Sequence, residues 1–403
     1  MRINSNLNFN KKNYSFCAGK TKLYTDFDGT YFPYPQDSIV YENTQNISEA
    51  NKMYSGFKKF ADLAKEKFSI VITTGRSRLE MLGMLRDFEK SKVDFYEPEG
   101  YIFRDGFEEN NNIKNGSLVD NSSSRFLNEK EDIKQIIHTI NNQITILEPL
   151  SNKRITGNSD RNLISLFKEQ APEKRKNYVS FVSETSGLIE LSFPPNTDTQ
   201  KYYEKISNYY YEKGIPVDIR VYNNDKNMYV PIQNDSTSEG YTFLPGNVIL
   251  IKHKNDDEPI DKLYQPKRAV KEILQNQTND LVIVAGDSSN DIKMLNPLNY
   301  IDTLDIYPDK NKSVDELLKD DKVLSAIDEL PLIIILAGEN KSIEPIRKMK
   351  DALDDKGIHK IFNAKYPDSD FLNKIKQGML IYSEQNDDFK YNLSFELYEE
   401  LME

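Results

Sequence analysis

Two short acidic loops carry the residue types and spacings in this sequence that could do chemistry. The first is the run DFDGT at residues 26–30, which directly follows the extended run Thr21 to Thr25. Residues two apart in an extended segment point to the same side, so the carboxylates of Asp26 and Asp28 are expected to face one point. One can attack an electrophile while the other moves a proton. Taken alone, the run also fits an ordinary acidic turn after a strand.

The second acidic loop is the run GDSSND at residues 286–291, after the apolar run Leu281 to Ala285. Asp287 and Asp291 are four residues apart, a spacing that puts two side chains on one face of a helical turn. Beside Asp26 they would repel one another unless a hard divalent cation lay between them, and oxygen ligands suit magnesium. A capped helix start with Asp287 as N-cap is the alternative. It leaves unexplained why two such loops follow strands.

Thr74 and Lys267 complete a plausible anion site. Thr74 follows the β-branched run Phe68 to Thr73, so its hydroxyl and nearby backbone amides could hold a phosphoryl oxygen; the alternative is a helix cap. Lys267 opens a predicted helix, where its charge could neutralise a nucleophile and a phosphate. A solvated surface lysine is the alternative, and Lys271 is a rival on the same helix face.

The first elements that must position these residues alternate between strands and helices. Such an order, with turns at the strand ends, favours a parallel sheet covered on both faces. The predicted strands are Thr21–Thr25, Phe68–Thr73 and Tyr101–Phe103, and the predicted helices are Ser48–Lys67 and Leu79–Lys90. Residues 110–124 are polar and are predicted to form a loop or linker.

From about Phe126 to Gly240 the pattern changes to strands and helices in pairs, which predicts an inserted α+β domain on a mostly antiparallel sheet. Its predicted helices are Lys130–Asn141, Asp160–Glu169 and Thr199–Lys213. Its predicted strands are Tyr178–Ser183, Leu188–Phe193, Val217–Tyr222 and Met228–Ile232.

The parallel pattern returns with a helix at Pro266–Asn276 and strands at Leu281–Ala285 and Leu332–Ala337, followed by a helix to about Asp354. The predicted fold class is therefore α/β, a Rossmann-like parallel-sheet core with an inserted α+β cap domain. We expect the core at residues 15–125 and 245–403, the latter with a C-terminal extension, and the cap at 126–244.

Length and composition limit the classes of protein. A chain of 403 residues exceeds one ordinary core and suits two domains. A formal charge of −11 opposes binding to a phosphate backbone, so a nucleic-acid partner is not expected. The longest apolar run, Leu332 to Ala337, is far too short to cross a bilayer, and the N-terminus lacks the apolar stretch of a secretory signal. We expect a cytoplasmic protein with no membrane partner.

Four segments, in this order, resemble the motifs of phosphatases of the haloacid dehalogenase superfamily. They are DFDGT at 26–30, TTGR at 73–76, KRA at 267–269 and GDSSND at 286–291. The forms of the last three look like the Cof-type and sucrose-phosphatase-like branch, in which a cap is inserted between the threonine and lysine motifs. The long gap between Thr74 and Lys267 matches that insertion point.

The resemblance implies a role for each matching residue. Asp26 would form an aspartyl-phosphate, and Asp28 would protonate the leaving group and then activate water. Magnesium would be held by Asp26, Asp287 and the Asp28 carbonyl, with Asp291 supporting the metal shell. The residues implied to bind the phosphoryl group are Thr74, Gly75, Lys267 and Asn290. Two features depart from the family pattern, namely the stretch 302–330 before the next strand and the tail after Tyr366.

Three functions are consistent with these residues. The first is hydrolysis of a small phosphorylated metabolite, such as a sugar or polyol phosphate, under a closing cap. The second is a phosphomutase of the phosphomannomutase type, which needs a second phosphate site and should show a compact arginine cluster in the cap. The sequence shows none there. The third is a non-enzymatic or toxin-like binding protein; such proteins commonly lose the nucleophile or metal acids, which are all present here.

Overall fold

The structure of the chain is a computed structural model. It describes residues 20–32, 44–64, 67–76, 81, 85, 88, 92–103, 108–110, 119–120, 129–147, 178–182, 188–193, 197–222, 248–255, 258–259, 261–309, 311–365 and 369–403. Two predicted elements, the helix at 160–169 and the strand at 228–232, lie outside these residues. Of the predicted helix at 79–90, the described residues Met81, Leu85 and Phe88 are helical and buried.

The larger of two sheets has eight strands in the order β14-β13-β12-β1-β2-β3-β4-β5. The first six run parallel, which confirms the predicted α/β class. They are β1 (Thr21–Thr25), β2 (Phe68–Thr73), β3 (Gly100–Phe103), β12 (Val282–Gly286), β13 (Leu332–Ala337) and β14 (Ile361–Ala364). Two short antiparallel strands, β4 (Glu108–Asn110) and β5 (Val119–Asp120), extend the edge. The prediction of a loop or linker over 110–124 is therefore wrong at residues 110, 119 and 120.

The central strands are apolar and β-branched because both faces of the sheet are covered. Every residue of β2, β12 and β13 is buried, as expected for a parallel sheet between two helical layers. In the register, Leu23 of β1 lies opposite Ile283 of β12 and Ile70 of β2. The carboxyl ends of these three neighbouring strands therefore meet at one edge of the sheet.

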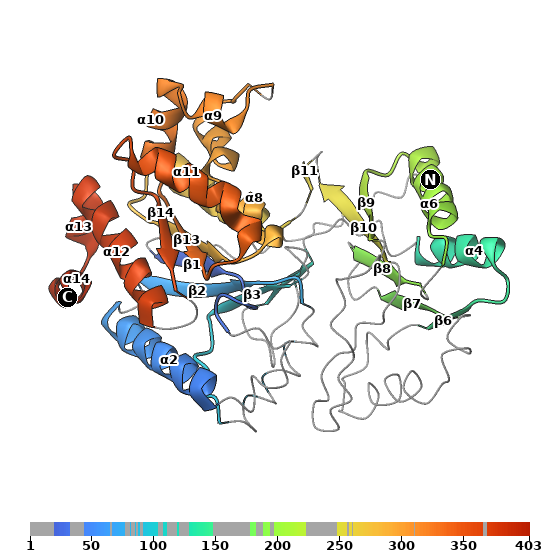
Figure 1. The fold of residues 1–403 in the computed structure, drawn as a ribbon, viewed down its shortest axis with the longest axis horizontal. Coiled ribbons are helices and arrows are strands. Elements are labelled where there is room, and N and C mark those ends of the chain that lie inside the picture. The colour runs from blue at the N-terminus through green and yellow to red at the C-terminus, as the bar shows by residue number, and fades with distance from the viewer. Residues whose placement is uncertain are drawn as a thin grey trace, which may run out of the picture.

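Helices cover the two faces of this sheet and build two apolar cores (Figure 1). One face is covered by α2 (Thr44–Ala64), α12 (Ser369–Gln385) and α14 (Phe395–Met402), with α13 (Asp387–Asn392) beside them. The other face carries α7 (Tyr264–Asn276), α8 (Ile292–Leu295), α9 (Val314–Leu317), α10 (Asp321–Glu329) and α11 (Glu344–Asp354). Described helices of the stretch 302–330 and of the tail after Tyr366 thus complete the helical layers on the two faces of the sheet.

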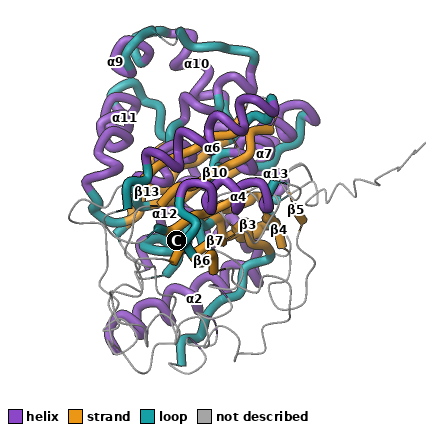
Figure 2. The backbone as a smooth tube through the Cα atoms, turned by 90° about the vertical axis from the view of Figure 1, so that its right-hand side faces the viewer, coloured by secondary structure: helices purple, strands orange, loops and turns teal. Residues whose placement is uncertain are grey.

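A second sheet of six strands lies to one side of the first (Figure 1). Its strands are β6 (Thr145–Leu147), β7 (Tyr178–Val182), β8 (Leu188–Ser192), β9 (Val217–Tyr222), β10 (Val248–Asn255) and β11 (Glu258–Pro259). All pairs are antiparallel except β6 with β7. Figure 2 shows the two helices α4 (Lys130–Ile140) and α6 (Gln200–Lys213) lying over these strands, with which they share a third apolar core.

The pairing of β10 concerns the predicted boundary between the inserted cap and the core. β10 and β11 lie beyond the predicted boundary at residue 244, yet both pair within the second sheet. The division into a core and an inserted cap at residues 126 and 244 stays a prediction. In the part of the chain described, no helix is long and apolar enough to span a membrane.

One lysine is buried in the core of the larger sheet. Lys360, immediately before β14, is 2% exposed, and its Nζ donates a hydrogen bond of 3.0 Å to the Leu330 carbonyl oxygen. The ring of Tyr382 lies 5.5 Å from the same ammonium. Burial lowers the pKa of Lys360 to about 8, because desolvation penalises the charged form.

Replacing this lysine with methionine is expected to stabilise the fold at neutral pH. Lys360→Met removes a buried charge, while the Leu330 carbonyl keeps the Leu332 N–H as a donor. We expect a gain of about 1–2 kcal/mol in the free energy of unfolding at pH 7, after about 1 kcal/mol for the lost hydrogen bond. A lowered lysine pKa makes the unfolded state bind more protons between pH 8 and 10.5, so wild-type stability rises there and the gain shrinks.

Urea titrations at pH 7 and above pH 9 measure this difference directly. The control is Lys356→Met, which makes the same change at an exposed residue. A Lys360→Met protein that is less stable than the wild type at pH 7 would contradict the prediction.

Candidate active site

The site lies at the carboxyl edge of the larger sheet, where three neighbouring strands end. Asp26 follows β1, Thr74 follows β2 and Asp287 follows β12. The Asp26 N–H donates to the Ala285 carbonyl oxygen at 2.9 Å, which continues the pairing of β1 with β12 past the last strand residue. The two acidic loops are therefore brought together by strand pairing, although their residues are far apart in the sequence.

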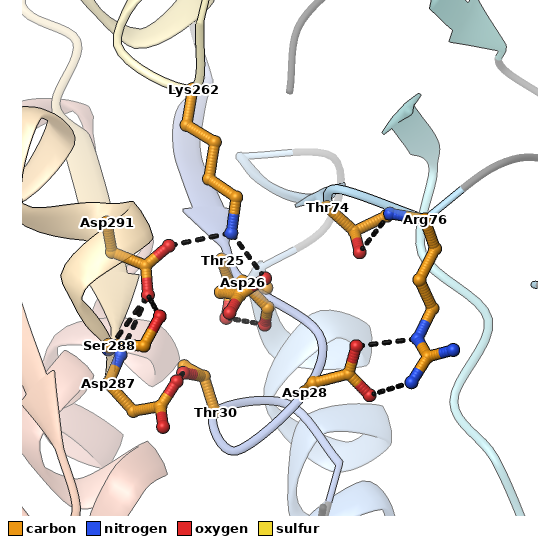
Figure 3. Close-up of polar contacts among 10 residues, drawn as sticks. All are labelled: Thr25, Asp26, Asp28, Thr30, Thr74, Arg76, Lys262, Asp287, Ser288 and Asp291. Atoms are coloured by element: carbon orange, nitrogen blue, oxygen red, sulfur yellow. Dashed lines mark hydrogen bonds and ion pairs between the residues drawn. The ribbon is translucent and has the colours of Figure 1, made fainter. Parts of the chain in front are cut away.

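Three carboxylates converge at this edge (Figure 3). Asp26, Asp287 and Asp291 each have one oxygen within 4.8 Å of an oxygen of the other two, and all three residues are buried. The Thr30 hydroxyl lies 3.5 Å from Asp287 Oδ1, beside the three carboxylates (Figure 3). The structure thus brings together three of the acids that the sequence predicts to hold a metal.

Asp291 is held by its own loop. Its Oδ2 accepts hydrogen bonds from the N–H of Asp287 at 3.1 Å, and from the N–H and the hydroxyl of Ser288, each at 3.0 Å. Ser288, not Asp287, is the N-cap of the short 3-10 helix that follows. Gly286 is required for this fit, because a Cβ there would lie 2.7 Å from the Asp291 carboxyl carbon. The second oxygen, Oδ1, faces away from the turn.

Lys262 neutralises part of the cluster. Its Nζ lies 2.8 Å from Asp26 Oδ1 and 2.7 Å from Asp291 Oδ1, and the side chain is only 5% exposed. The lysine occupies a turn just before α7. Asp261 fixes that turn, because its Oδ1 accepts the Leu263 N–H at 3.0 Å and its Oδ2 accepts from Lys293 Nζ at 2.8 Å.

The structure does not place Lys267 at the site, contrary to the sequence prediction. The Lys267 ammonium instead forms an ion pair of 2.5 Å with Asp302. The reason is that α7 begins at Tyr264, so Lys267 lies inside the helix and faces the 3-10 turn Ile301–Leu304. Lys262 is the lysine that contacts Asp26 and Asp291 instead. A lysine in the turn that leads into the helix was the available sequence signal, and the KRA motif obscured it.

Asp28 also differs from the sequence expectation. Its carboxylate points away from the three-acid cluster and toward Arg76, as Figure 3 shows. The Arg76 Nε lies 2.6 Å from Asp28 Oδ2, and Nη2 lies 2.8 Å from Oδ1. The strand ends at Thr25 and the chain turns through Gly29, which has a φ of 81°. The rule that residues two apart point the same way therefore no longer applies to Asp28.

The remaining predicted residues take different positions. Thr74 is buried, its N–H donates to the Ile102 carbonyl at 2.9 Å, and its Oγ1 accepts the Arg76 N–H at 3.2 Å. This contact resembles the cap that was the alternative interpretation of Thr74, and it turns the chain so that Arg76 comes over Asp28. Gly75 and Asn290 are exposed. Their predicted contacts with a phosphoryl group stay predictions.

The charge balance of the cluster fits a divalent cation. Burial raises the pKa of Asp26 well above its usual range; the charge of Asp291 raises it further, and Lys262 only partly opposes both. Burial, followed by the charge of Asp291, raises the pKa of Asp287 to about 7. One ammonium does not balance three buried carboxylates, and the donor set consists only of oxygens. Asp26, Asp287 and Asp291 could therefore hold Mg²⁺, which prefers such ligands.

Comparison with known proteins yields matches among solved structures. No family model matches the chain, and no curated protein matches it. Among solved structures, the sucrose-phosphatase from Synechocystis sp. PCC6803, in complex with sucrose and phosphate, aligns over 88% of this chain and 96% of its own. The identity is 13% and the TM-score 0.35, a likeness too low to assign function.

Magnesium is expected to stabilise the protein more at pH 8 than at pH 5. A raised carboxyl pKa means that the folded state holds a proton that the unfolded state has lost, so metal-free stability falls as the pH rises through about 7. Mg²⁺ binds the deprotonated acids and offsets that loss. At a hundredfold excess over Kd, we expect about 2.7 kcal/mol of stabilisation at pH 8 and much less at pH 5.

Thermal denaturation with MgCl₂ or EDTA measures the effect. Asp287→Asn should abolish it, whereas the exposed Asp315→Asn should leave it unchanged. An equal rise in Tm at both pH values would show that the ion binds elsewhere.

Proposed function

We propose that the chain is a magnesium-dependent phosphomonoester hydrolase that acts through an aspartyl-phosphate on Asp26. The observation that carries the proposal is the buried group in which Lys262 bridges Asp26 and Asp291 beside Asp287. A carboxylate nucleophile, a fixed cation and a set of oxygen ligands next to it are what phosphoryl transfer needs. The resemblance of the motifs to haloacid dehalogenase phosphatases supports the same chemistry.

In the first half of the reaction, an oxygen of Asp26 attacks the phosphorus and the bond to the ester oxygen breaks. Lys262 offsets charge on Asp26 and on the phosphoryl oxygens, since its Nζ lies 2.8 Å from the attacking carboxylate. Bound Mg²⁺ would offset further negative charge on the phosphoryl group. Thr74, buried directly after β2, would donate its hydroxyl to a phosphoryl oxygen.

Asp28 would move the protons. It gives a proton to the departing ester oxygen, and in the second half it takes one from the water that attacks the phosphorus. That attack releases inorganic phosphate and restores the Asp26 carboxylate. Asp28 lies close enough for its charge to act on both Asp26 and Asp287, although its carboxylate is turned toward Arg76 in this structure.

The substrate class we propose is a small phosphorylated metabolite, such as a sugar or polyol phosphate. The branch of the family that the motifs resemble supports this choice, and the net charge of −11 disfavours a nucleic-acid substrate. We propose that the second sheet with α4 and α6 is a cap inserted between Thr74 and Lys262. Its closure would exclude water from the reacting phosphoryl group.

Paired lysine variants test the proposed site most sharply. Lys262→Met should lower kcat for phosphate release at least about 100-fold, because it removes a preorganised charge at the reacting atoms. Lys267→Met should leave kcat within about threefold, because Lys267 pairs with Asp302 instead. Release of inorganic phosphate from a panel of sugar and polyol monophosphates is the measurement.

Asp26→Asn serves as the blank and should abolish turnover. A large fall in kcat for Lys267→Met, with little fall for Lys262→Met, would refute the assignment of Lys262 as the cation at the site. Formation of an isomeric monophosphate that depends on an added bisphosphate activator, with little release of inorganic phosphate, would indicate a mutase instead. No phosphate release from any monophosphate by the wild type with Mg²⁺ would reject the hydrolase.

A further inference from the structure

Arg76 and Asp28 form a partly exposed ion pair, which an entering ligand could reach. Both Asp28 oxygens accept from the guanidinium, at 2.6 and 2.8 Å, and each side chain is 19% exposed. Lys262, by comparison, is 5% exposed and is held between two carboxylates. Of these two cations at the site, Arg76 is the one open to an entering ligand.

The pair keeps Asp28 away from the reacting group. With both oxygens engaged by Arg76, the carboxylate points away from Asp26 (Figure 3), so it cannot at the same time contact the ester oxygen of a phosphate on Asp26. Proton transfer by Asp28 therefore requires that at least one of its two contacts with Arg76 be released. Water or an entering ligand can then accept from the guanidinium, whose side chain is 19% exposed.

A phosphate group is the natural replacement. Its oxygens accept two parallel N–H bonds from a guanidinium in the same forked geometry as a carboxylate. Arg76 follows Thr74, whose hydroxyl is assigned to a phosphoryl oxygen, and the Arg76 N–H already contacts that hydroxyl at 3.2 Å. Thr74 and Arg76 thus follow the same strand end, and the long arginine side chain could turn from Asp28 toward a phosphoryl group held at Thr74.

We propose that Arg76 exchanges acceptors when a phosphate monoester enters: its guanidinium passes from Asp28 to the phosphoryl oxygens, and Asp28 is released toward the ester oxygen. The exchange rests on the proposed function. It makes Arg76 a phosphate ligand and also the residue that positions Asp28, so that Asp28 is brought to the leaving group only when a substrate phosphate is present. A neutral alcohol or an unphosphorylated sugar would not trigger it.

Binding of inorganic phosphate tests the exchange without turnover. Calorimetric titration in the presence of Mg²⁺ compares the wild type with Arg76→Met and with the charge-matched double variant Arg76→Met/Asp28→Asn. Loss of the forked contact should weaken binding about tenfold in both variants. The double variant matters because Arg76→Met alone leaves an uncompensated Asp28 that repels phosphate.

Two further variants complete the set. Arg76→Lys keeps the positive charge but loses the two parallel N–H donors of the guanidinium. It should therefore bind phosphate more weakly than the wild type but more tightly than Arg76→Met. Arg268→Met removes a half-exposed arginine that bonds to Glu272 on the outside of α7, and it should bind like the wild type. Thermal denaturation of each variant verifies that it is folded.

Wild-type affinity in the double variant would overturn the proposal, because Arg76 would then only neutralise Asp28. Failure of the wild type to bind phosphate would overturn it as well. If the wild type hydrolyses monophosphates while the double variant keeps wild-type affinity, the exchange is refuted and the hydrolase stands. Absence of hydrolysis by the wild type would instead reject the proposed function.

Discussion

The paired ion contacts of Lys262 with Asp26 and Asp291 are the interaction on which the arrangement of the site depends. Burial beside the other acids raises the pKa of Asp26 and of Asp287, and a single well-placed ammonium offsets part of the cost of burying these charges. The remaining negative charge would favour a bound cation. The turn that carries Lys262 is tied through Asp261 to Lys293, so the ammonium and the Asp291 loop keep a fixed spacing.

The parallel sheet makes this convergence possible. β12, β1 and β2 are neighbours, and their carboxyl ends present Asp287, Asp26 and Thr74 side by side without long loops. Sites on the ends of packed strands hold their geometry better than sites on free loops. The helices of 302–330 and those of the C-terminal tail cover the two faces of the same strands, so both segments belong to the scaffold of the site.

Much of this could be predicted from the sequence, and the exceptions have physical causes. The strands around Leu23, Ile70 and Ile334 can be predicted from the sequence, because β-branched runs that end in acidic loops are typical of buried parallel strands. Convergence of Asp26 with Asp287 follows from that topology. The sequence does not identify Lys262 as the site cation, because Lys267 matches the motif and Lys262 lies in a turn that carries no motif. The turn is fixed by the contact between Asp261 and Lys293. A local sequence pattern cannot predict a contact between residues so far apart in the chain.

The orientation of Asp28 could not be predicted for a related reason. Alternation of side chains holds only while the chain is extended, and here it ends where Gly29 adopts a left-handed backbone. The partner of Asp28, Arg76, comes from the end of another strand, and only the folded sheet brings the two together. Asp26 and Asp287 were paired correctly because both directly follow neighbouring strands.

The central claim, that Asp26 is a nucleophile beside one divalent ion, is tested most directly by a crystal structure of the protein grown with Mg²⁺ and beryllium fluoride, which mimics a phosphoryl group on a carboxylate. The predicted result is a beryllium fluoride adduct on an Asp26 oxygen, with Mg²⁺ between Asp26 and Asp287. An ion bound away from these carboxylates, or an adduct on any other residue, would contradict it.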